Sequence, residues 1–453
     1  MISVLRSFFL VIMLLCAGVP ALCQTTVVLT NEPELTTGPL PMLQDEHYSP
    51  EQLRTDPHLH FEPAAPLETR NGDSYWMKLE IDNPYPNNEA YRLHLSLPLN
   101  YTLYAFDAQH NTWHSRNAGP GVASGQVDAS SAPLLLQGAG HTLVYLKVST
   151  TGLQQYGYTI QPTVILEKEI FKHIMELRTW VAWLTCLALL LCFCCYNLYV
   201  YLQLKDKVYG AYFLLQIGAL IYITAFRRFF SLLPFAWYHV RLQPDGSMSC
   251  YDLNAFLLHL GGLIVMEATM QLCRFYLDTP RQMPAYDKLL KWLSVAYAIY
   301  ALVPALLTIS RVFYLDNYTL FYENIFVIVI IGTVMYTSMI AWRRHIQAGR
   351  HFLLANALPF VLAGSIAGYF LVHTSPVYAD VDSFLPEIAI LSQVVTFGVA
   401  LLARMRGIQE QLRRREAEME RLAEVVEQTT YKHMLLEQEH QMIRSVLKKE
   451  RRL

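Results

Sequence analysis

Long apolar runs dominate the second half of the chain, and charged residues lie mainly in the short segments between them. A helix that crosses a bilayer needs roughly 20 mostly apolar residues, and seven runs satisfy this. We therefore predict a seven-helix membrane domain over residues 179–404. The expected spans are residues 179–202, 209–225, 254–273, 289–309, 318–342, 352–372 and 387–402.

The preceding segment, residues 24–178, alternates apolar and polar positions instead. Tyr75, Met77, Leu79 and Ile81 would share one face of a strand, and Asp82-Asn83-Pro84 supplies a turn. Short strands of this kind, without a helical period, predict an all-β sandwich of the jelly-roll type. The other expected strands cover residues 91–97, 101–106, 141–148 and 156–165, whereas residues 24–70 are weakly patterned and a polar loop is expected around residues 113–119.

The last segment, residues 405–453, is charged, lacks proline and reads as a helix. Its apolar residues follow a heptad register, which predicts a cytoplasmic coiled coil in preference to a lone charged helix in water. The clearest seam residues are Leu412, Met419, Leu422 and Val426.

The two ends of the chain are expected on opposite sides of the membrane. Residues 1–23 have a positive Arg6, a short apolar run and small residues near Cys23, which is typical of a signal peptide. Lys and Arg concentrate in the loops that follow the first, third and fifth spans, and such loops face the cytoplasm. We therefore expect the N-terminal segment outside and the C-terminus inside.

Composition narrows the function classes. The chain has 453 residues, is 53% hydrophobic and carries a net charge of -2, so nothing favours nucleic-acid binding. The exported segment after Cys23 has no cysteine for a disulfide. Cys192, Cys194 and Cys195 lack metal-site spacing and are expected to pack within a helix. No cofactor and no metal is expected.

Polar residues within spans are the first candidate sites, because burying them in a membrane is costly. We interpret them as interhelical hydrogen-bonding residues or, alternatively, as a switch that exchanges partners. Gly364 and Gly368 form a small-residue motif expected to pack against another helix. The candidate polar residues are Asn197, His259, Glu267 and Glu323.

Aromatic residues near the expected loops of the sandwich are the second candidate site. Exposed rings can stack on sugars, whereas strand aromatics usually fill the core. The candidates for a carbohydrate-like ligand are Trp113, His114, Tyr156 and Tyr158.

Several short motifs, in order along the chain, resemble one family. The motifs are Tyr75-Trp76-Met77-Lys78-Leu79 with Asn83, Pro98-Leu99-Asn100-Tyr101, Val144-Tyr145-Leu146-Lys147-Val148, Tyr196-Asn197-Leu198 with Asp206, Tyr209 and Tyr212, Phe275-Tyr276-Leu277-Asp278-Thr279 with Pro284, and Phe397-Gly398-Val399-Ala400-Leu401 with Arg404. Together they resemble the bacterial receptors with seven transmembrane helices and diverse intracellular signalling modules (7TM-DISM).

That resemblance implies a multi-pass sensory receptor of the bacterial inner membrane with an extracellular jelly-roll sensor domain. Family members usually continue into a histidine kinase or a nucleotide cyclase. This sequence contains no Gly-Gly-Asp-Glu-Phe motif, no kinase glycine motif and no His-Glu-x-x-x-Pro box. We therefore expect a non-enzymatic homodimer that signals to a separate protein, such as a kinase or cyclase.

Other functions remain open from the sequence. A transporter or channel with an exported binding domain is the main alternative, although no inverted repeat is visible. An intramembrane enzyme would need a nucleophile motif around Ser365, and a retinal pump would need a lysine within residues 387–402; neither is present.

Overall fold

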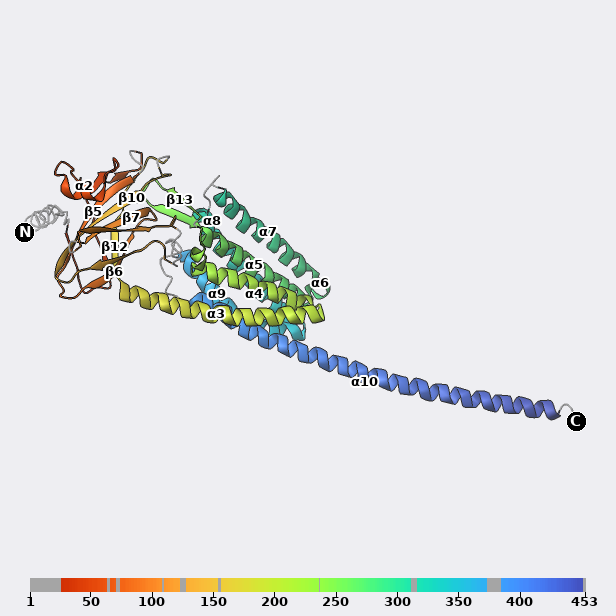
Figure 1. Cartoon of the computed structure of the whole chain (residues 1–453). Helices are drawn as coiled ribbons and strands as arrows, with labels where there is room; N and C mark the ends of the chain where they lie inside the picture. Colours follow the sequence, from red (N-terminus) through yellow and green to blue (C-terminus); the bar gives the residue numbers. More distant parts are fainter. Residues whose placement is uncertain are drawn as a thin grey trace, which may run out of the picture.

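Three parts follow one another in space in the computed structural model (Figure 1). A β-rich part lies at one end, a helix bundle lies in the middle, and one long helix leaves the far end of the bundle. The structure describes residues 26–62, 66–70, 74–107, 110–122, 128–153, 156–235, 237–310, 316–372 and 384–450. The expected signal peptide lies outside these residues.

The N-terminal part is a sandwich of two sheets. The first sheet has the strand order β1-β5-β10-β7-β8, with β3 also paired to β5, and the second has the order β2-β12-β6-β9. The strands of the first sheet are β1 (Thr26–Val28), β3 (Met42–Gln44), β5 (Ser74–Asn83), β7 (Asn100–Asp107), β8 (Thr112–Ala118) and β10 (Gly140–Ser149). Those of the second are β2 (Glu34–Thr36), β6 (Glu89–Leu95), β9 (Ala132–Leu136) and β12 (Val164–Lys168), while β4 (Leu67–Glu68) and β11 (Thr159–Ile160) form a separate pair.

The inner faces of the two sheets share one core. The predicted face of β5 is buried there, with Met77 and Leu79 fully enclosed, opposite Leu93 of β6 and Leu166 of β12. Alternation along each strand brings these residues to the same side, and their burial removes apolar surface from water. The prediction of an all-β sandwich is confirmed.

Three details of the strand prediction are wrong. Residues 112–118 form β8 and not a loop, because their pairing with β7 overrides their polar composition. Residues 156–165 do not form one strand, since Pro162 separates β11 from β12 and cannot donate to a ladder. The weakly patterned segment, residues 24–70, contains four strands and the helix α2 (Pro50–Thr55). A capping box of Ser49 and Gln52 begins this helix.

Helix α2 covers a second, smaller core on the outer face of the first sheet. Trp76 and Tyr145 are buried there against Leu53. Asp45 lies at the edge of this cluster. Its carboxylate accepts hydrogen bonds from Ser74 Oγ and Trp76 Nε1, both at 2.8 Å, and lies 2.6 Å from Lys147 Nζ. Burial would raise the pKa of Asp45, but these three partners outweigh it and lower the pKa from 3.8 to about 2.

Within the described residues, seven helices are long and apolar enough to cross a membrane, as predicted. Two of them differ from the expected spans, because α3 begins well before residue 179 and α10 continues far beyond residue 402. The seven are α3 (Glu169–Leu204), α4 (Lys207–Phe226), α5 (Leu253–Tyr276), α7 (Pro284–Ile309), α8 (Asp316–Arg343), α9 (Gln347–Val372) and α10 (Leu385–Glu450). The connectors include η1 (Phe229–Leu232), α6 (Thr279–Gln282) and the hairpin of β13 (Tyr238–Leu242) and β14 (Met248–Asp252).

Close helix packing occurs at glycines other than the predicted pair. A side chain at Gly261 of α5 would lie 2.6 Å from the backbone nitrogen of Tyr222, and one at Gly218 of α4 would lie 2.8 Å from Ile264. The absence of a Cβ therefore lets α4 and α5 approach each other. Among the described residues, no atom of another helix lies within 4 Å of a Cβ added at Gly364 or Gly368, so the predicted packing is not found in this bundle.

We predict that Asp45→Asn lowers the free energy of local unfolding of the cluster around Trp76 and Tyr145 by about 2 kcal/mol at neutral pH. The reason is that the amide cannot form the ion pair with Lys147. The folded pKa of Asp45 lies below its unfolded value. The stabilisation of the wild type should therefore be complete above pH 4 and disappear as the pH falls to about 2. Pepsin cleavage within residues 45–62 of the full chain, followed by mass spectrometry, measures this.

The control is Asp82→Asn, at a half-exposed carboxylate on the same sheet that pairs with His141. The two variants should differ clearly at pH 4 and converge with the wild type near pH 2. Equal cleavage of the wild type and Asp45→Asn at pH 4 would contradict the role of Asp45.

Candidate functional site: the junction between sandwich and helices

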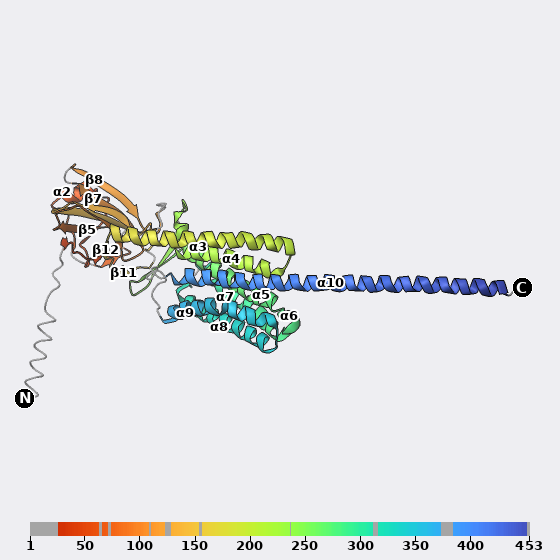
Figure 2. The same cartoon turned by 90° about the horizontal axis from the view of Figure 1, so that it is seen from below.

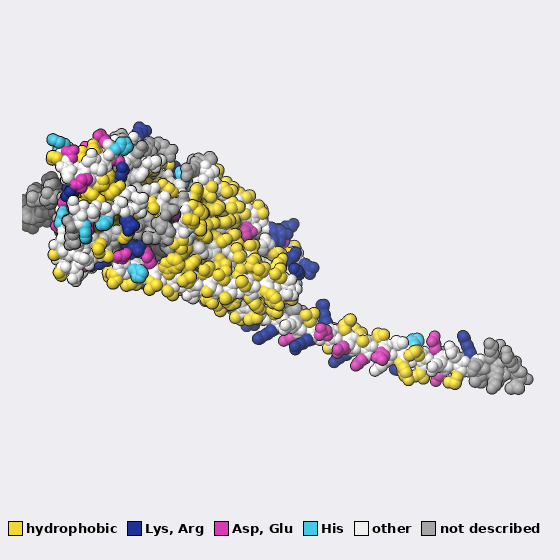
Figure 3. Space-filling model, in the orientation of Figure 1, with side chains coloured by type: hydrophobic (Ala, Val, Ile, Leu, Met, Phe, Trp, Pro, Cys, Tyr) yellow, Lys and Arg dark blue, Asp and Glu magenta, His cyan; other side chains and the backbone are white. Residues whose placement is uncertain are grey.

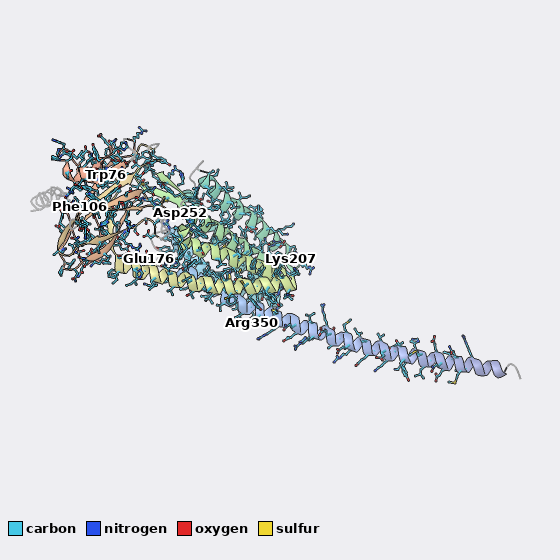
Figure 4. The ribbon with its side chains drawn as sticks, viewed as in Figure 1. Trp76, Phe106, Glu176, Lys207, Asp252 and Arg350 are labelled. Carbon is cyan, nitrogen blue, oxygen red and sulfur yellow. The ribbon has the colours of Figure 1, made fainter. Side chains whose placement is uncertain are left out.

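The first attachment of the sandwich to the bundle is continuous backbone. Strand β12 ends at Lys168, which is extended and directly precedes the first turn of α3. Arg92 of β6 donates to Glu176 of α3 at 2.8 Å, and Lys172 of α3 lies 3.2 Å from Asp128. Figure 4 shows Glu176 between the two parts. The second sheet therefore continues into α3 without a linker.

Burial and ion pairing shift the pKa values of the ionisable side chains at this attachment. Burial would raise the pKa of Asp128, but Lys172 and Ser130 outweigh it and lower the pKa to about 2. Burial lowers the pKa of the neighbouring His94, and the charge of Lys172 lowers it further. Asp128 is thus ionised over the physiological range, so the Asp128–Lys172 pair persists there.

The second attachment is the β13–β14 hairpin, which lies between α4 and α5 in the chain. Leu242 is 1% exposed and belongs to the sandwich core, where Val240 and Met248 also pack. Asn100 Nδ2 of β7 donates to Tyr238 Oη at 2.6 Å. A segment of the helix domain thus completes the core of the sandwich.

The hairpin ends at Asp252, where α5 begins. Asp252 Oδ1 accepts a hydrogen bond from the backbone nitrogen of Ala255 at 2.9 Å, which caps the helix. Its Oδ2 accepts from Arg228 Nη2 at 2.8 Å. Figure 4 places Asp252 on the side of the bundle that faces the sandwich. One carboxylate therefore connects the hairpin, α5 and the segment after α4.

That segment, residues 227–229, is the centre of the site, and we call it the junction turn. Arg227 pairs through Nε with Glu387 Oε1 at the start of α10, and their side chains are 0% and 5% exposed. Arg228 holds Asp252, and Phe229 stacks on Trp183 of α3 with a centroid distance of 3.9 Å. The left-handed backbone of Arg228, with φ at 61°, lets successive side chains point to different elements.

The junction turn therefore joins both attachments to the helix that leaves the bundle. The sandwich reaches it through α3 and through the hairpin, and Arg227 continues the connection to α10. A buried ion pair has few alternative arrangements, because each charge needs its partner away from water. This geometry suits the transfer of small displacements between the sandwich and α10.

The predicted polar residues of the spans all have partners on neighbouring helices. His259 Nδ1 lies 2.9 Å from Glu323 Oε2, which joins α5 to α8, and Ser294 of α7 donates to Glu267. Asn197 Nδ2 donates to Gln216 Oε1 at 3.3 Å and joins α3 to α4. The arrangement fits interhelical bonding and does not bring the candidates together as one site.

The predicted ligand residues of the sandwich separate into two places. Trp113 packs on Phe106 and Tyr145, at 5.0 and 5.7 Å between ring centroids, and donates to Glu51, while His114 next to it is exposed. Tyr156 and Tyr158 stack on each other at 6.5 Å and are partly buried against the main core. Of these four side chains, that of His114 is exposed and the other three are partly buried.

The tail of α10 presents its predicted seam to solvent. Leu412, Met419, Leu422 and Val426 are between 54% and 69% exposed. Figures 1 and 2 both show this part of α10 extending away from the bundle. A row of exposed apolar residues at heptad spacing is available for another helix.

Sequence reasoning missed the junction turn. Arg227 and Arg228 follow the predicted second span closely, and Glu387 is the first residue of the predicted seventh span. The sequence did contain one signal for this pairing. The end of the second span, with two arginines, and the start of the seventh span, with one glutamate, are expected on the same side of the membrane. Pairing across 160 residues is set only by helix packing.

Comparison with known proteins identifies the bundle. The model of the family described as 7TM diverse intracellular signalling matches residues 180–404. No curated protein and no solved structure matches the chain. The match begins within α3 and ends within α10, so it covers all seven helices.

We predict that Arg227→Met lowers the unfolding free energy of the full chain by about 3–5 kcal/mol, because it leaves the Glu387 carboxylate buried without its cation. The double variant Arg227→Met with Glu387→Met should recover most of this loss, since two apolar side chains replace the pair. Thermal unfolding in lipid nanodiscs measures both.

The matched control is Arg228→Met, which removes a partly exposed arginine next in the chain and should cost about 1 kcal/mol or less. If the double variant is as unstable as Arg227→Met alone, the pair is not what holds α10 to α4.

Proposed function

The chain belongs, through its seven helices, to the 7TM diverse intracellular signalling family, and on that premise we propose that it is a transmembrane sensory receptor. The sandwich detects a ligand or partner outside the cytoplasm. The junction turn passes the resulting displacement to α10, and the tail of α10 presents the signal to a separate protein.

The observation that supports this best is the continuity of α10. It is one helix of 66 residues, from the junction turn to Glu450. At 1.5 Å per residue it is about 100 Å long, so it extends well beyond the bundle. An uninterrupted helix transmits rotation and displacement of one end to the other, and here that end is held by Arg227.

The mechanism requires two arrangements of the bundle with different affinities for the ligand. The sandwich has two attachments, α3 and the hairpin, so a change in the angle between its sheets moves them relative to each other. Both meet at the junction turn. A ligand that binds one angle of the sandwich better would therefore favour one position of α10.

We place the ligand on the sandwich and retain a carbohydrate-like molecule as its class. Trp113 is only partly buried, so part of its ring is open as an aromatic surface, and the exposed His114 lies on the opposite face of β8. The Tyr156–Tyr158 pair lies against the main core and is the less accessible candidate.

We propose that the sandwich lies outside the cytoplasmic membrane of a bacterium and the tail inside. Figure 3 shows Lys and Arg side chains gathered at the end of the bundle where the tail leaves, whereas the helix surface between is apolar. This concentration of Lys and Arg in the short loops at the tail end supports a cytoplasmic position for that end.

The tail is proposed to associate through its seam, with a second copy forming a homodimer. The paired tails would then contact a signalling protein such as a histidine kinase or a nucleotide cyclase. The support is the exposure of the seam, because an apolar side chain fully buried on pairing contributes about 1.5–3 kcal/mol. The transporter alternative has no comparable support, since the matched family is described as signalling.

Topology is the first test. Alkaline phosphatase fused after Ala132 should be active, whereas the same enzyme fused after Lys205 should be inactive, because it folds only outside the cytoplasm. A fluorescent reporter after Leu453 should be bright. Activity at Lys205 with none at Ala132 would reverse the orientation and refute an external sensor.

Association of the tail is the second test. Leu422→Glu with Val426→Glu should abolish cross-linking between tails of the full-length protein in membranes, because it places four charges in one paired seam. Insertion should be unchanged, since both residues lie beyond the apolar part of α10. Capture of the native cytoplasmic partner should also be lost.

The matched control is Val425→Glu with Met434→Glu, which adds the same charge at exposed positions of the tail outside the seam. It should cross-link like the wild type. Loss of cross-linking in both double variants, or in neither, would mean that the seam is not the association surface.

A further inference from the structure

A cavity of about 170 Å³ lies inside the bundle, in the half nearer the sandwich. It is lined by α4, α5, α7, α8, α9 and α10, and its lining residues Phe226 and Pro386 adjoin Arg227 and Glu387 in the chain. Its wall is mainly apolar, with Met266, Val327, Phe360, Ala363 and Ile390 among its residues.

One polar side chain in this wall has no partner. Gln393 of α10 is 7% exposed and lines the cavity, and its amide makes no hydrogen bond to any residue within the described part of the chain. Burying an amide without a hydrogen bond is unfavourable, so such groups normally have a partner. Its two donors and its acceptor oxygen are available to a molecule in the cavity.

A second polar group lines the same cavity from the side of α5 and α8. The His259–Glu323 pair lies there with Tyr297, whose hydroxyl is 3.4 Å from Glu323 Oε1. These three already bond to one another, whereas the Gln393 amide has no hydrogen-bond partner among the described residues. The cavity is therefore an apolar space with a polar side.

Size limits the occupant. An apolar cavity of about 150 Å³ in another protein stays dry and binds benzene. A cavity of 170 Å³ accordingly accommodates one six-membered ring with a small substituent. A hydroxyl substituent both donates and accepts, so it can satisfy the amide of Gln393, whereas a purely apolar ring cannot.

We propose that this cavity is a ligand site for a small neutral ring compound with one hydroxyl group, of the phenol class, that enters from the lipid phase. Such a molecule partitions into bilayers and carries one hydrogen-bonding group. This site is separate from the sandwich and does not depend on the function proposed for it.

Residues of α10, the helix that continues into the tail, form part of the cavity wall. Pro386, Ala389, Ile390 and Gln393 of α10 all line the cavity, and Glu387, the partner of Arg227, lies among them in the chain. A bound ring would contact α10 together with α5, α8 and α9. A bound ring would thus favour one position of the first turns of α10.

The test uses the full chain in lipid nanodiscs with two probes, phenol and toluene, which have the same number of heavy atoms and differ in the hydroxyl. Thermal unfolding against probe concentration gives an apparent affinity. Phenol should bind the wild type more tightly than toluene. Gln393→Leu should weaken phenol binding about five-fold, with little effect on toluene.

A ring placed in the cavity should exclude both probes. Ala363→Phe fills the space, and its matched control is Val361→Phe, which adds the same ring on α9 at a position that is 64% exposed and outside the cavity. The control should bind phenol like the wild type. The Gln393→Leu comparison still tests the site if Ala363→Phe does not fold.

Equal shifts by phenol and toluene in the wild type, or equal phenol affinity in the wild type and Gln393→Leu, would refute the proposal. So would phenol binding to folded Ala363→Phe at wild-type affinity. These readouts measure binding only, so they can fail while sensing by the sandwich holds, and the reverse is also possible.

Discussion

The buried pair of Arg227 and Glu387 is the interaction on which the arrangement of this protein depends. It joins the end of α4 to the start of α10, at the level where the sandwich meets the bundle. Both charges are away from water, so each is tolerable only while the other is in place. Few contacts could fix the origin of the long helix as strictly, because apolar packing alone allows helices to slide and rotate in lipid.

The sandwich depends on the same region for a different reason. Its second sheet runs directly into α3, and its core is completed by Leu242 from a hairpin within the helix domain. The two parts of the chain therefore share core residues as well as a connection. Neither attachment is a flexible linker, and the proposed transfer of displacement depends on that.

Polar residues within the helices serve two purposes. Some join neighbouring helices, as His259 does with Glu323 and Asn197 with Gln216. Others, such as Thr269 and Ser338, donate to the backbone of their own helix. Gln393 departs from that rule and faces a cavity instead. Its amide has no hydrogen-bond partner among the described residues, and the proposed ligand site is argued from that observation.

The sequence by itself determined the seven apolar helices, the alternating strands of the sandwich and the helical tail, because these depend on local periodicity and on the length needed to cross lipid. It also identified His259 and Glu323 as costly to bury. Tertiary structure alone decided their pairing, the contribution of Leu242 to a core far away in the chain, and the meeting of Arg227 with Glu387. These contacts join residues distant in sequence, and no local pattern specifies which surfaces of two helices or two domains will meet.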